Sequence, residues 1–131
     1  MSEIKISGNK LLKTIKAEFQ KEFNYLSIGF YSLKDWQKAN NRAGTIYDLD
    51  SSKRLSEVRT KVPSGDNQIS IHGNTLVKNL EKNFKETYGV CVQVCYAKDG
   101  KGYYTSGQAD DMTLSALNKY LKENGYDKNP K

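Results

Sequence analysis

The sequence repeats part of itself, and this repeat limits the architecture more than any other feature. Residues 4–13 return 65 positions later as residues 69–78, and the alignment continues through residue 31. Over these 28 positions, eight residues are identical to their counterparts: Ile4, Ile6, Gly8, Asn9, Leu11, Lys13, Phe19 and Tyr31. Because the identities fall at apolar and turn positions, the chain is predicted to contain two diverged copies of one structural unit.

Each copy is predicted to begin with a strand, a turn and a helix. Strands at residues 3–7 and 68–72 precede a Gly-Asn turn, where glycine permits a positive φ. Asn9, or Thr75 in the second copy, is expected to cap the helix that follows. Apolar residues about four apart predict the core face of both helices, and Asn24 and Gly89 are expected to end them in the left-handed conformation. These apolar residues are Leu11, Leu12, Ile15, Phe19 and Phe23 in the first copy and Leu76, Val77, Leu80, Phe84 and Tyr88 in the second.

The rest of each copy is predicted to be strand, strand and helix. Second strands are expected at residues 25–32 and 90–97, with a shift of one residue between the copies left open. In the second copy residues 98–102 predict a hairpin turn into a strand at 103–106, and a final helix begins near Asp110 and ends at Gly125. In the first copy a longer segment, residues 33–44, replaces the hairpin. A strand at 45–48 and a helix from about Ser51 follow it.

The pattern as a whole predicts an α+β fold made of two tandem β-α-β-β-α units. The first unit spans residues 1–61, a turn-rich linker spans 62–67, and the second unit spans 68–131. A unit of about 60 residues buries only a small core. We therefore expect the units to pack about a pseudo-two-fold axis as one compact fold, with one extended, mostly antiparallel sheet and the helices on one face.

The second copy resembles a small bacterial module of unassigned function. The residues that carry the resemblance are Gly73, Asn74, Tyr88, Gly89, Val90 and the run Ala109, Asp110, Asp111, Thr113 and Leu114. The first copy departs from this pattern after its helix. The resemblance implies a bacterial or phage accessory module, and it implies no catalytic residues.

Composition excludes several classes of protein. No stretch approaches the roughly 20 apolar residues of a membrane-spanning helix, and the N-terminus lacks the apolar core of a secretory signal. Two cysteines provide no disulfide framework, and a single histidine provides no multi-histidine zinc site. We expect a cytoplasmic protein without metal or cofactor.

Candidate catalytic features all have an ordinary structural explanation. The helix start after Gly8 and Asn9, with Lys10 nearby, could hold a phosphate, but a plain turn with a helix cap is the favoured interpretation. Cys91 and Cys95 fit buried thiols better than a nucleophile paired with His72. Asp110 and Asp111 sit where a helix cap belongs. We therefore predict no enzyme and assign no catalytic residue; a metal-dependent hydrolase or nuclease acting through Asp110 or Asp111 is the remaining enzymatic alternative.

The charge distribution supports one alternative function, nucleic-acid binding. The net charge is +6, and the first 65 residues hold 12 of the 21 basic residues against 7 of the 15 acidic ones. A basic face is typical of proteins that contact phosphates. In this alternative the contacts come from Lys10, Lys13, Lys53, Arg54 and Arg59.

The leading hypothesis is a non-enzymatic module that binds a protein partner. The chain has nine tyrosines and one tryptophan, and aromatic residues are enriched at protein interfaces. Trp36, Tyr103 and Tyr104 are the predicted anchors, on the hairpins and the exposed sheet edge. Tyr103 and Tyr104 are adjacent in a strand, so only one of them faces any given ligand.

Overall fold

The fold is α+β, with helices and two antiparallel sheets. The computed structural model describes residues 3–32, 49–61, 69–105 and 107–130. Its elements in chain order are β1 (Ile4–Lys5), α1 (Leu12–Glu22), β2 (Ser27–Ser32), α3 (Leu55–Val58), β3 (Ser70–Ile71), α4 (Val77–Tyr88), β4 (Val90–Lys98), β5 (Lys101–Tyr104), the 3-10 helix η1 (Gly107–Asp111) and α5 (Leu114–Glu123).

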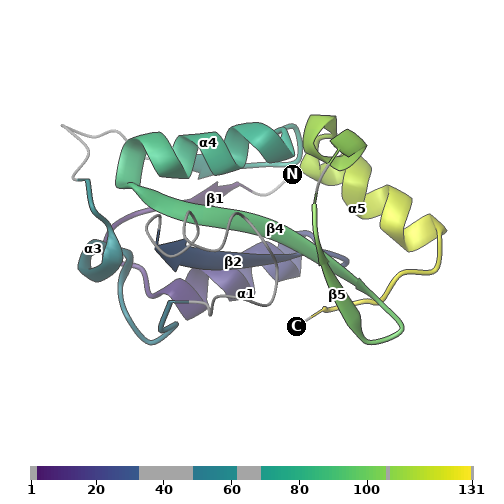
Figure 1. Ribbon diagram of the computed structural model, residues 1–131, viewed down its shortest axis with the longest axis horizontal. Coiled ribbons are helices and arrows are strands. Elements are labelled where there is room, and N and C mark those ends of the chain that lie inside the picture. Colours follow the sequence, from purple (N-terminus) through teal and green to yellow (C-terminus); the bar gives the residue numbers. More distant parts are fainter. Residues whose placement is uncertain (1–2, 33–48, 62–68, 106, 131) are drawn as a thin grey trace.

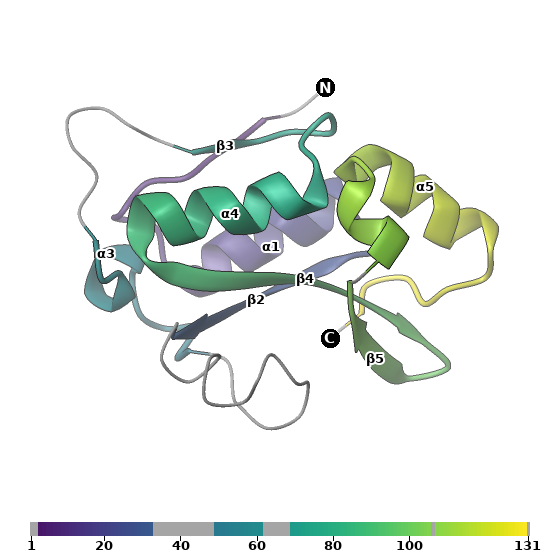
Figure 2. The same cartoon turned by 45° about the horizontal axis from the view of Figure 1, so that its top comes forward.

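The elements form three layers (Figures 1 and 2). Helices α1 and α4 lie side by side between a small sheet, β1–β3, and a larger sheet with the strand order β2–β4–β5. Helix α5 and η1 pack at one end of the larger sheet, beside the β4–β5 hairpin. Apolar residues from all three layers and from both halves of the chain form one core.

The prediction of one extended sheet is wrong. Strands β1 and β3 pair only with each other, with Ile4 opposite Ile71, and they cover the side of the helices that faces away from β2 and β4. Ile6 and Ile71 are fully buried there. Extending the larger sheet with these strands would leave that side of both helices in water, so burial of apolar surface favours the separate sheet. Helices α1 and α4 do lie on one face of the larger sheet, as expected.

The pairing of β2 with β4 settles the register that the sequence left open. Ile28 lies opposite Val94 and Phe30 opposite Val92 in an antiparallel ladder. All four side chains are buried against the helices, and the Phe30 ring meets the Phe84 ring of α4 edge to face at 5.8 Å. Even-numbered residues of both strands therefore face the helices, so an offset of 65 residues would set an inward residue of one strand against an outward residue of the other.

Backbone carbonyls of a neighbouring segment, rather than side-chain caps, receive the first N–H groups of α1 and α4. Neither helix has a side-chain cap, so the expectation for Asn9 and Thr75 is wrong. Gly8 and Gly73, in the turns before these helices, do not have the positive φ that glycine would permit. The same three hydrogen bonds occur twice. In the first half, the N–H groups of Leu12, Leu55 and Ser56 donate to the carbonyls of Lys53, Lys10 and Gly8, respectively. In the second half, the N–H groups of Val77, Leu114 and Ser115 donate to the carbonyls of Met112, Thr75 and Gly73, respectively.

The helix ends follow the prediction in the second half only. Gly89 has a φ of 63° at the end of α4, as expected. Helix α1 ends at Phe23 with a φ of −125°, and Asn24 has no positive φ. A left-handed residue is needed only where the chain turns sharply into the next strand, and β4 begins directly after Gly89.

The C-terminal third agrees with the hairpin prediction and corrects the helix start. Asp99 and Gly100 have φ values of 54° and 82°, which is the backbone of a tight hairpin turn. Strand β5 begins at Lys101, two residues earlier than expected. Asp110 lies in η1, and α5 begins only at Leu114, where the Thr113 hydroxyl accepts a hydrogen bond from the Ala116 N–H at 3.1 Å.

Several predictions fall outside the described residues. These are Trp36, the strand at 45–48 and the linker at 62–67. The predicted helix from about Ser51 is short, because α3 comprises only Leu55–Val58.

Gly89 generates a prediction about stability. A Cβ atom at this position would overlap the Thr60 hydroxyl, which donates to the Gly89 carbonyl at 2.8 Å. Gly125 also has a positive φ, 75°, but a Cβ there would meet nothing within 4 Å. We expect Gly125→Ala to cost about 1 kcal/mol of left-handed strain. Gly89→Ala should cost about 1–3 kcal/mol more, because of the overlap.

Urea unfolding of the wild type and the two variants measures this difference. Equal free energies of unfolding for the two variants would contradict the contact between Thr60 and Gly89.

Candidate binding site at the hairpin

Strand β4 extends beyond its first partner and carries a two-stranded ribbon away from the core. Its first residues pair with β2 up to Cys95, and its last residues pair with β5. In this ribbon Tyr96 lies opposite Tyr103, and Lys98 lies opposite Lys101. Figure 1 shows β5 standing beside α5, so the ribbon and α5 form two sides of one surface.

Four tyrosines fill the space between the ribbon and α5. The Tyr96 and Tyr103 rings stack with centroids 5.4 Å apart, and Tyr126 meets Tyr96 edge to face at 5.5 Å. Tyr120, on α5, lies 6.4 Å from Tyr126. We call Tyr96, Tyr103, Tyr120 and Tyr126 the tyrosine cluster. Tyr103 and Tyr120 are 40% and 48% exposed and are large hydrophobic side chains on the surface, so part of each ring is available to a partner.

A hollow of about 220 Å³ opens within this surface. It is lined by three members of the tyrosine cluster and by apolar side chains of η1 and α5; the lining residues are Tyr96, Gln108, Ala109, Met112, Leu117, Tyr120, Leu121 and Tyr126. Pockets for cofactors and drug-sized ligands measure roughly 300–1,000 Å³. This hollow, the tyrosine pocket, has room for one side chain of a partner rather than for a whole cofactor.

Two lysines lie over the outer rings of the cluster. The Lys98 Nζ lies 5.1 Å from the centroid of Tyr126, and the Lys101 Nζ lies 5.7 Å from the centroid of Tyr103. Both distances are within the range of cation–π attraction. The border of the pocket on the hairpin side is therefore positively charged.

The ribbon is held in place by the segment that follows α5. The Asp127 carboxylate accepts hydrogen bonds from the N–H groups of Asp99 at 3.1 Å and Gly100 at 2.8 Å. The Asp127 N–H donates to the Ala97 carbonyl at 2.9 Å. These contacts fix the hairpin relative to α5, and they use the Asp127 carboxylate internally.

Tyr104 points to the opposite face of the sheet from Tyr103, as strand geometry requires. Its hydroxyl lies 3.0 Å from that of Tyr31, and the two rings meet edge to face. With Cys91 they form a small second apolar cluster on the outer face of the larger sheet. Of the three predicted anchors, Tyr103 belongs to the tyrosine cluster and Tyr104 does not.

The five basic residues of the alternative site lie in neighbouring segments. Residues 8–13 and 51–56 are joined by backbone hydrogen bonds, which places Lys10 and Lys13 near Lys53 and Arg54, and the Arg59 guanidinium lies beside Gly8. The Lys10 ammonium pairs with Glu18 at 2.7 Å, and the Lys53 ammonium lies 3.9 Å from Glu57.

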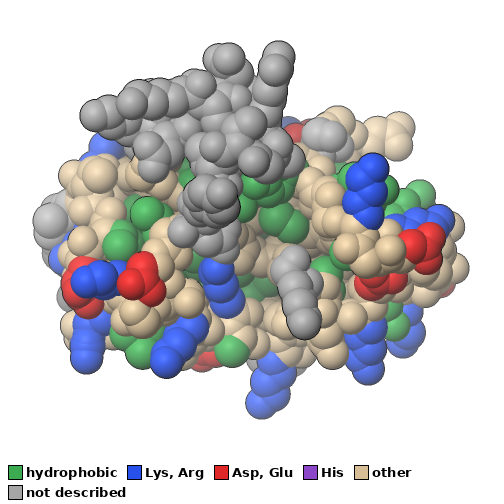
Figure 3. Space-filling view, turned by 60° about the horizontal axis from the view of Figure 1, so that its bottom comes forward, with side chains coloured by type: hydrophobic (Ala, Val, Ile, Leu, Met, Phe, Trp, Pro, Cys, Tyr) green, Lys and Arg blue, Asp and Glu red, His purple; other side chains and the backbone are tan. Residues whose placement is uncertain are grey.

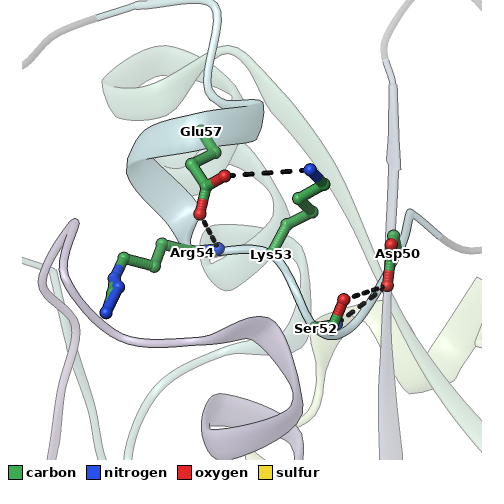
Figure 4. Close-up of polar contacts among 5 residues, drawn as sticks. All are labelled: Asp50, Ser52, Lys53, Arg54 and Glu57. Carbon is green, nitrogen blue, oxygen red and sulfur yellow. Dashed lines mark hydrogen bonds and ion pairs between the residues drawn. The ribbon is translucent and has the colours of Figure 1, made fainter.

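Figure 4 shows how the second of these segments is ordered internally. The Arg54 side chain extends away from Lys53, while Glu57 Oε1 accepts from the Arg54 N–H at 3.0 Å. The Asp50 carboxylate accepts from the Ser52 N–H and hydroxyl, which lowers the pKa of Asp50. On the face shown in Figure 3, basic side chains are spaced along the margin, some beside acidic ones, and do not gather into one patch.

The backbone N–H groups that would bind a phosphate already donate hydrogen bonds within the protein. At the start of α1, the Leu12 N–H donates to the Lys53 carbonyl and the Lys13 N–H donates to the Ser51 carbonyl, both at 2.9 Å. An anion at this helix end would have to displace these carbonyls.

The structure also does not bring Cys91 and His72 together, as a catalytic pair would require. Cys91 is a free thiol on the outer face of the larger sheet, whereas His72 lies in the turn after β3, on the far side of the helix layer. Burial raises the pKa of Cys91 to about 11. A protonated thiol far from an imidazole is a poor nucleophile.

A second polar cluster lies between α4 and η1. Glu81 Oε2, Thr105 Oγ1 and Asp110 Oδ1 are buried and have no hydrogen-bond partner among the described residues. The pKa of Glu81 is raised to about 7: burial is the main cause and the Asp110 carboxylate adds to it, whereas the Val94 backbone and the Thr105 hydroxyl act against it. Burial also raises the pKa of Asp110, and the Thr105 hydroxyl again acts against it. Asp111 is instead paired with the Lys78 ammonium at 2.9 Å.

Comparisons with known proteins give no match. No protein-family model matches the chain, and neither the curated proteins nor the solved structures contain a significant match. Within the described residues, no helix combines the length and apolar character needed to cross a membrane. The same residues contain no group of three or more His, Cys, Asp or Glu side chains placed to hold a metal ion.

Sequence reasoning found one of the four members of the tyrosine cluster. Tyr96 and Tyr120 fit the apolar patterns of β4 and α5 and carry no sign of a binding role in the sequence, and Tyr126 lies beyond the last predicted element. Tyr120 is the one large side chain of that helix pattern that is exposed. In the sequence, its place beside Leu117 and Leu121 predicts a buried side chain and does not indicate its exposure.

The Glu81 carboxyl generates a prediction about pH. Its pKa in the folded protein, about 7, lies above its ordinary value of 4.5, so the folded state binds the proton more tightly. The contribution of Glu81 to stability is therefore fully present below about pH 4.5 and is lost as the pH rises towards 7. Glu81→Gln should remove this pH-dependent loss of stability; the buffer contains a chelator so that metal ions do not affect the result.

The measurement is the free energy of unfolding of each variant minus that of the wild type between pH 4.5 and 8. Glu86→Gln, which changes an exposed residue of the same helix, is the control for the loss of one carboxyl group. A difference for Glu81→Gln that does not change with pH would contradict the raised pKa.

Proposed function

We propose that the chain is a non-enzymatic module that binds a protein partner through the tyrosine pocket. The partner segment places one aromatic or large aliphatic side chain in the pocket, and its acidic residues contact Lys98 and Lys101. The observation that carries this proposal is the exposed tyrosine cluster around a hollow the size of one side chain. Interface hot spots are typically rigid aromatic anchors in such pockets.

Charge complementarity supports an acidic partner. Lys98 lies over the ring of Tyr126, which lines the pocket, and Lys101 lies over the neighbouring ring of Tyr103; the chain carries a net charge of +6. The nearby Asp127 carboxylate is already occupied by the hairpin N–H groups. An acidic segment would therefore meet attraction at the border of the pocket and would be steered towards it.

We further infer that the fold derives from two copies of one unit related by a pseudo-two-fold axis. The three repeated hydrogen bonds at the starts of α1 and α4 support this duplication. The antiparallel pairing of β1 with β3 and of β2 with β4, each between counterparts, is the arrangement that a two-fold axis produces. The tyrosine cluster belongs to the second copy alone, so binding would be a property that the copies do not share.

Nucleic-acid binding through the first half is the weaker alternative. Two of its five basic residues, Lys10 and Lys53, are already paired with carboxylates. Phosphate contacts would have to compete with these pairs, and the affinity would fall steeply with salt. Charge reversal at Lys53 and Arg54 tests it, by fluorescence anisotropy with labelled single-stranded RNA and DNA at physiological salt.

The proposed function is tested with peptides. A random 12-residue phage library is selected on the immobilised protein, and the enriched peptides are synthesised with a fluorescent label. We expect enriched peptides to contain an aromatic or large aliphatic residue flanked by Asp or Glu. Tyr120→Ala should weaken their binding at least about tenfold, because it removes one wall of the pocket.

Lys119→Ala, which changes an exposed residue of the same helix outside the pocket, is the matched control and should bind like the wild type. Circular dichroism checks that each variant is folded. Peptides that bind Tyr120→Ala as tightly as the wild type, or peptides without acidic residues, would contradict the proposal.

A further inference from the structure

Three side chains from three different segments each hold a buried oxygen atom and are near enough to influence one another. Glu81 belongs to α4, Thr105 follows β5, and Asp110 belongs to η1. One oxygen atom of each side chain is buried without a hydrogen-bond partner among the described residues. Thr105 is only 6% exposed, and its hydroxyl is close enough to both carboxyls to lower the pKa of each. We call these three residues the oxygen cluster.

Among the described residues, no basic side chain forms an ion pair with the carboxylates of the oxygen cluster. The charged groups that face it are Lys78 from α4 and Asp111 from η1, and these two are paired with each other at 2.9 Å. The neighbouring Cys91 thiol of β4 is held protonated by burial. Buried carboxylates are costly unless they are paired, hydrogen-bonded or bound to a metal ion.

The chemistry of the three side chains selects a class of ligand. Carboxylate and hydroxyl oxygens are the ligands of hard cations, whereas the soft transition metals prefer sulfur and imidazole. Mg²⁺ in particular is held by one or two carboxylates and keeps several water ligands. Glu81 and Asp110 are only half-buried, so solvent can supply those waters. A bound ion is one explanation for buried polar groups that lack a hydrogen-bond partner within the protein.

We propose that Glu81, Thr105 and Asp110 bind a hard divalent cation, Mg²⁺ or Mn²⁺. The two carboxylates supply the charge, the Thr105 hydroxyl supplies a third ligand, and water completes the coordination. The ion joins α4, the end of β5 and η1. The proposal is independent of the peptide-binding function.

The test is isothermal titration of the full chain with MgCl₂ and MnCl₂ after dialysis against a chelator, with thermal unfolding in parallel. We expect one ion per chain with a Kd of about 1 mM or tighter, the weak end for hard cations in proteins, and a melting temperature that rises with ion concentration. Glu81→Gln and Asp110→Asn should each weaken binding at least tenfold. Glu86→Gln should have no effect.

Thr105→Val keeps the shape of the side chain and removes the hydroxyl, so it tests the same site if a carboxyl variant does not fold. It should weaken binding several-fold. The proposal is overturned if neither ion gives heat or a melting shift at about ten times the expected Kd. It is equally overturned if the binding seen is the same in Glu81→Gln, Asp110→Asn and Thr105→Val, because the ion would then lie elsewhere.

Discussion

The antiparallel ladder between β2 and β4 is the constraint on which the rest of the structure depends. Six residue pairs, from Ser27 opposite Cys95 to Ser32 opposite Val90, bring the two halves of the chain together. The ladder directs Ile28, Phe30, Val92 and Val94 towards α1 and α4, where they are buried. Because alternate strand residues face opposite sides, a shift of one residue would turn this set to solvent. The register therefore decides which side chains form the core.

The same ladder explains where the candidate site lies. β4 is nine residues long and β2 is six, so β4 continues past β2, and its last residues pair along their other edge with β5. The ribbon that results has no helix layer beneath it comparable to α1 and α4, and α5 and the tyrosines support it. The surface that we propose for binding thus lies beyond the β2–β4 ladder, while the ladder itself covers the core.

Much of the fold followed from the sequence, and the site did so only in part. The apolar stripes predicted α1 and α4, and the glycine turn predicted the β4–β5 hairpin, because each depends on local periodicity or on a backbone preference. The separate β1–β3 sheet was missed, since two-residue strands carry no signal about which edge they pair with. The starts of α1 and α4 were missed because carbonyls distant in sequence replace the expected caps. Tyr103 was predicted from its place in the hairpin, whereas Tyr96, Tyr120 and Tyr126 come together only through tertiary packing.

The most direct measurement of the central claim is an amide chemical-shift map of the ¹⁵N-labelled protein, titrated with an acidic peptide selected on it. The account predicts that the shifted amides cluster on β4 after Cys95, on β5, η1 and α5, around the tyrosine pocket. Shifts concentrated instead at residues 8–13 and 51–59, around Lys10 and Arg54, would contradict it and would place binding on the basic segments of the first half.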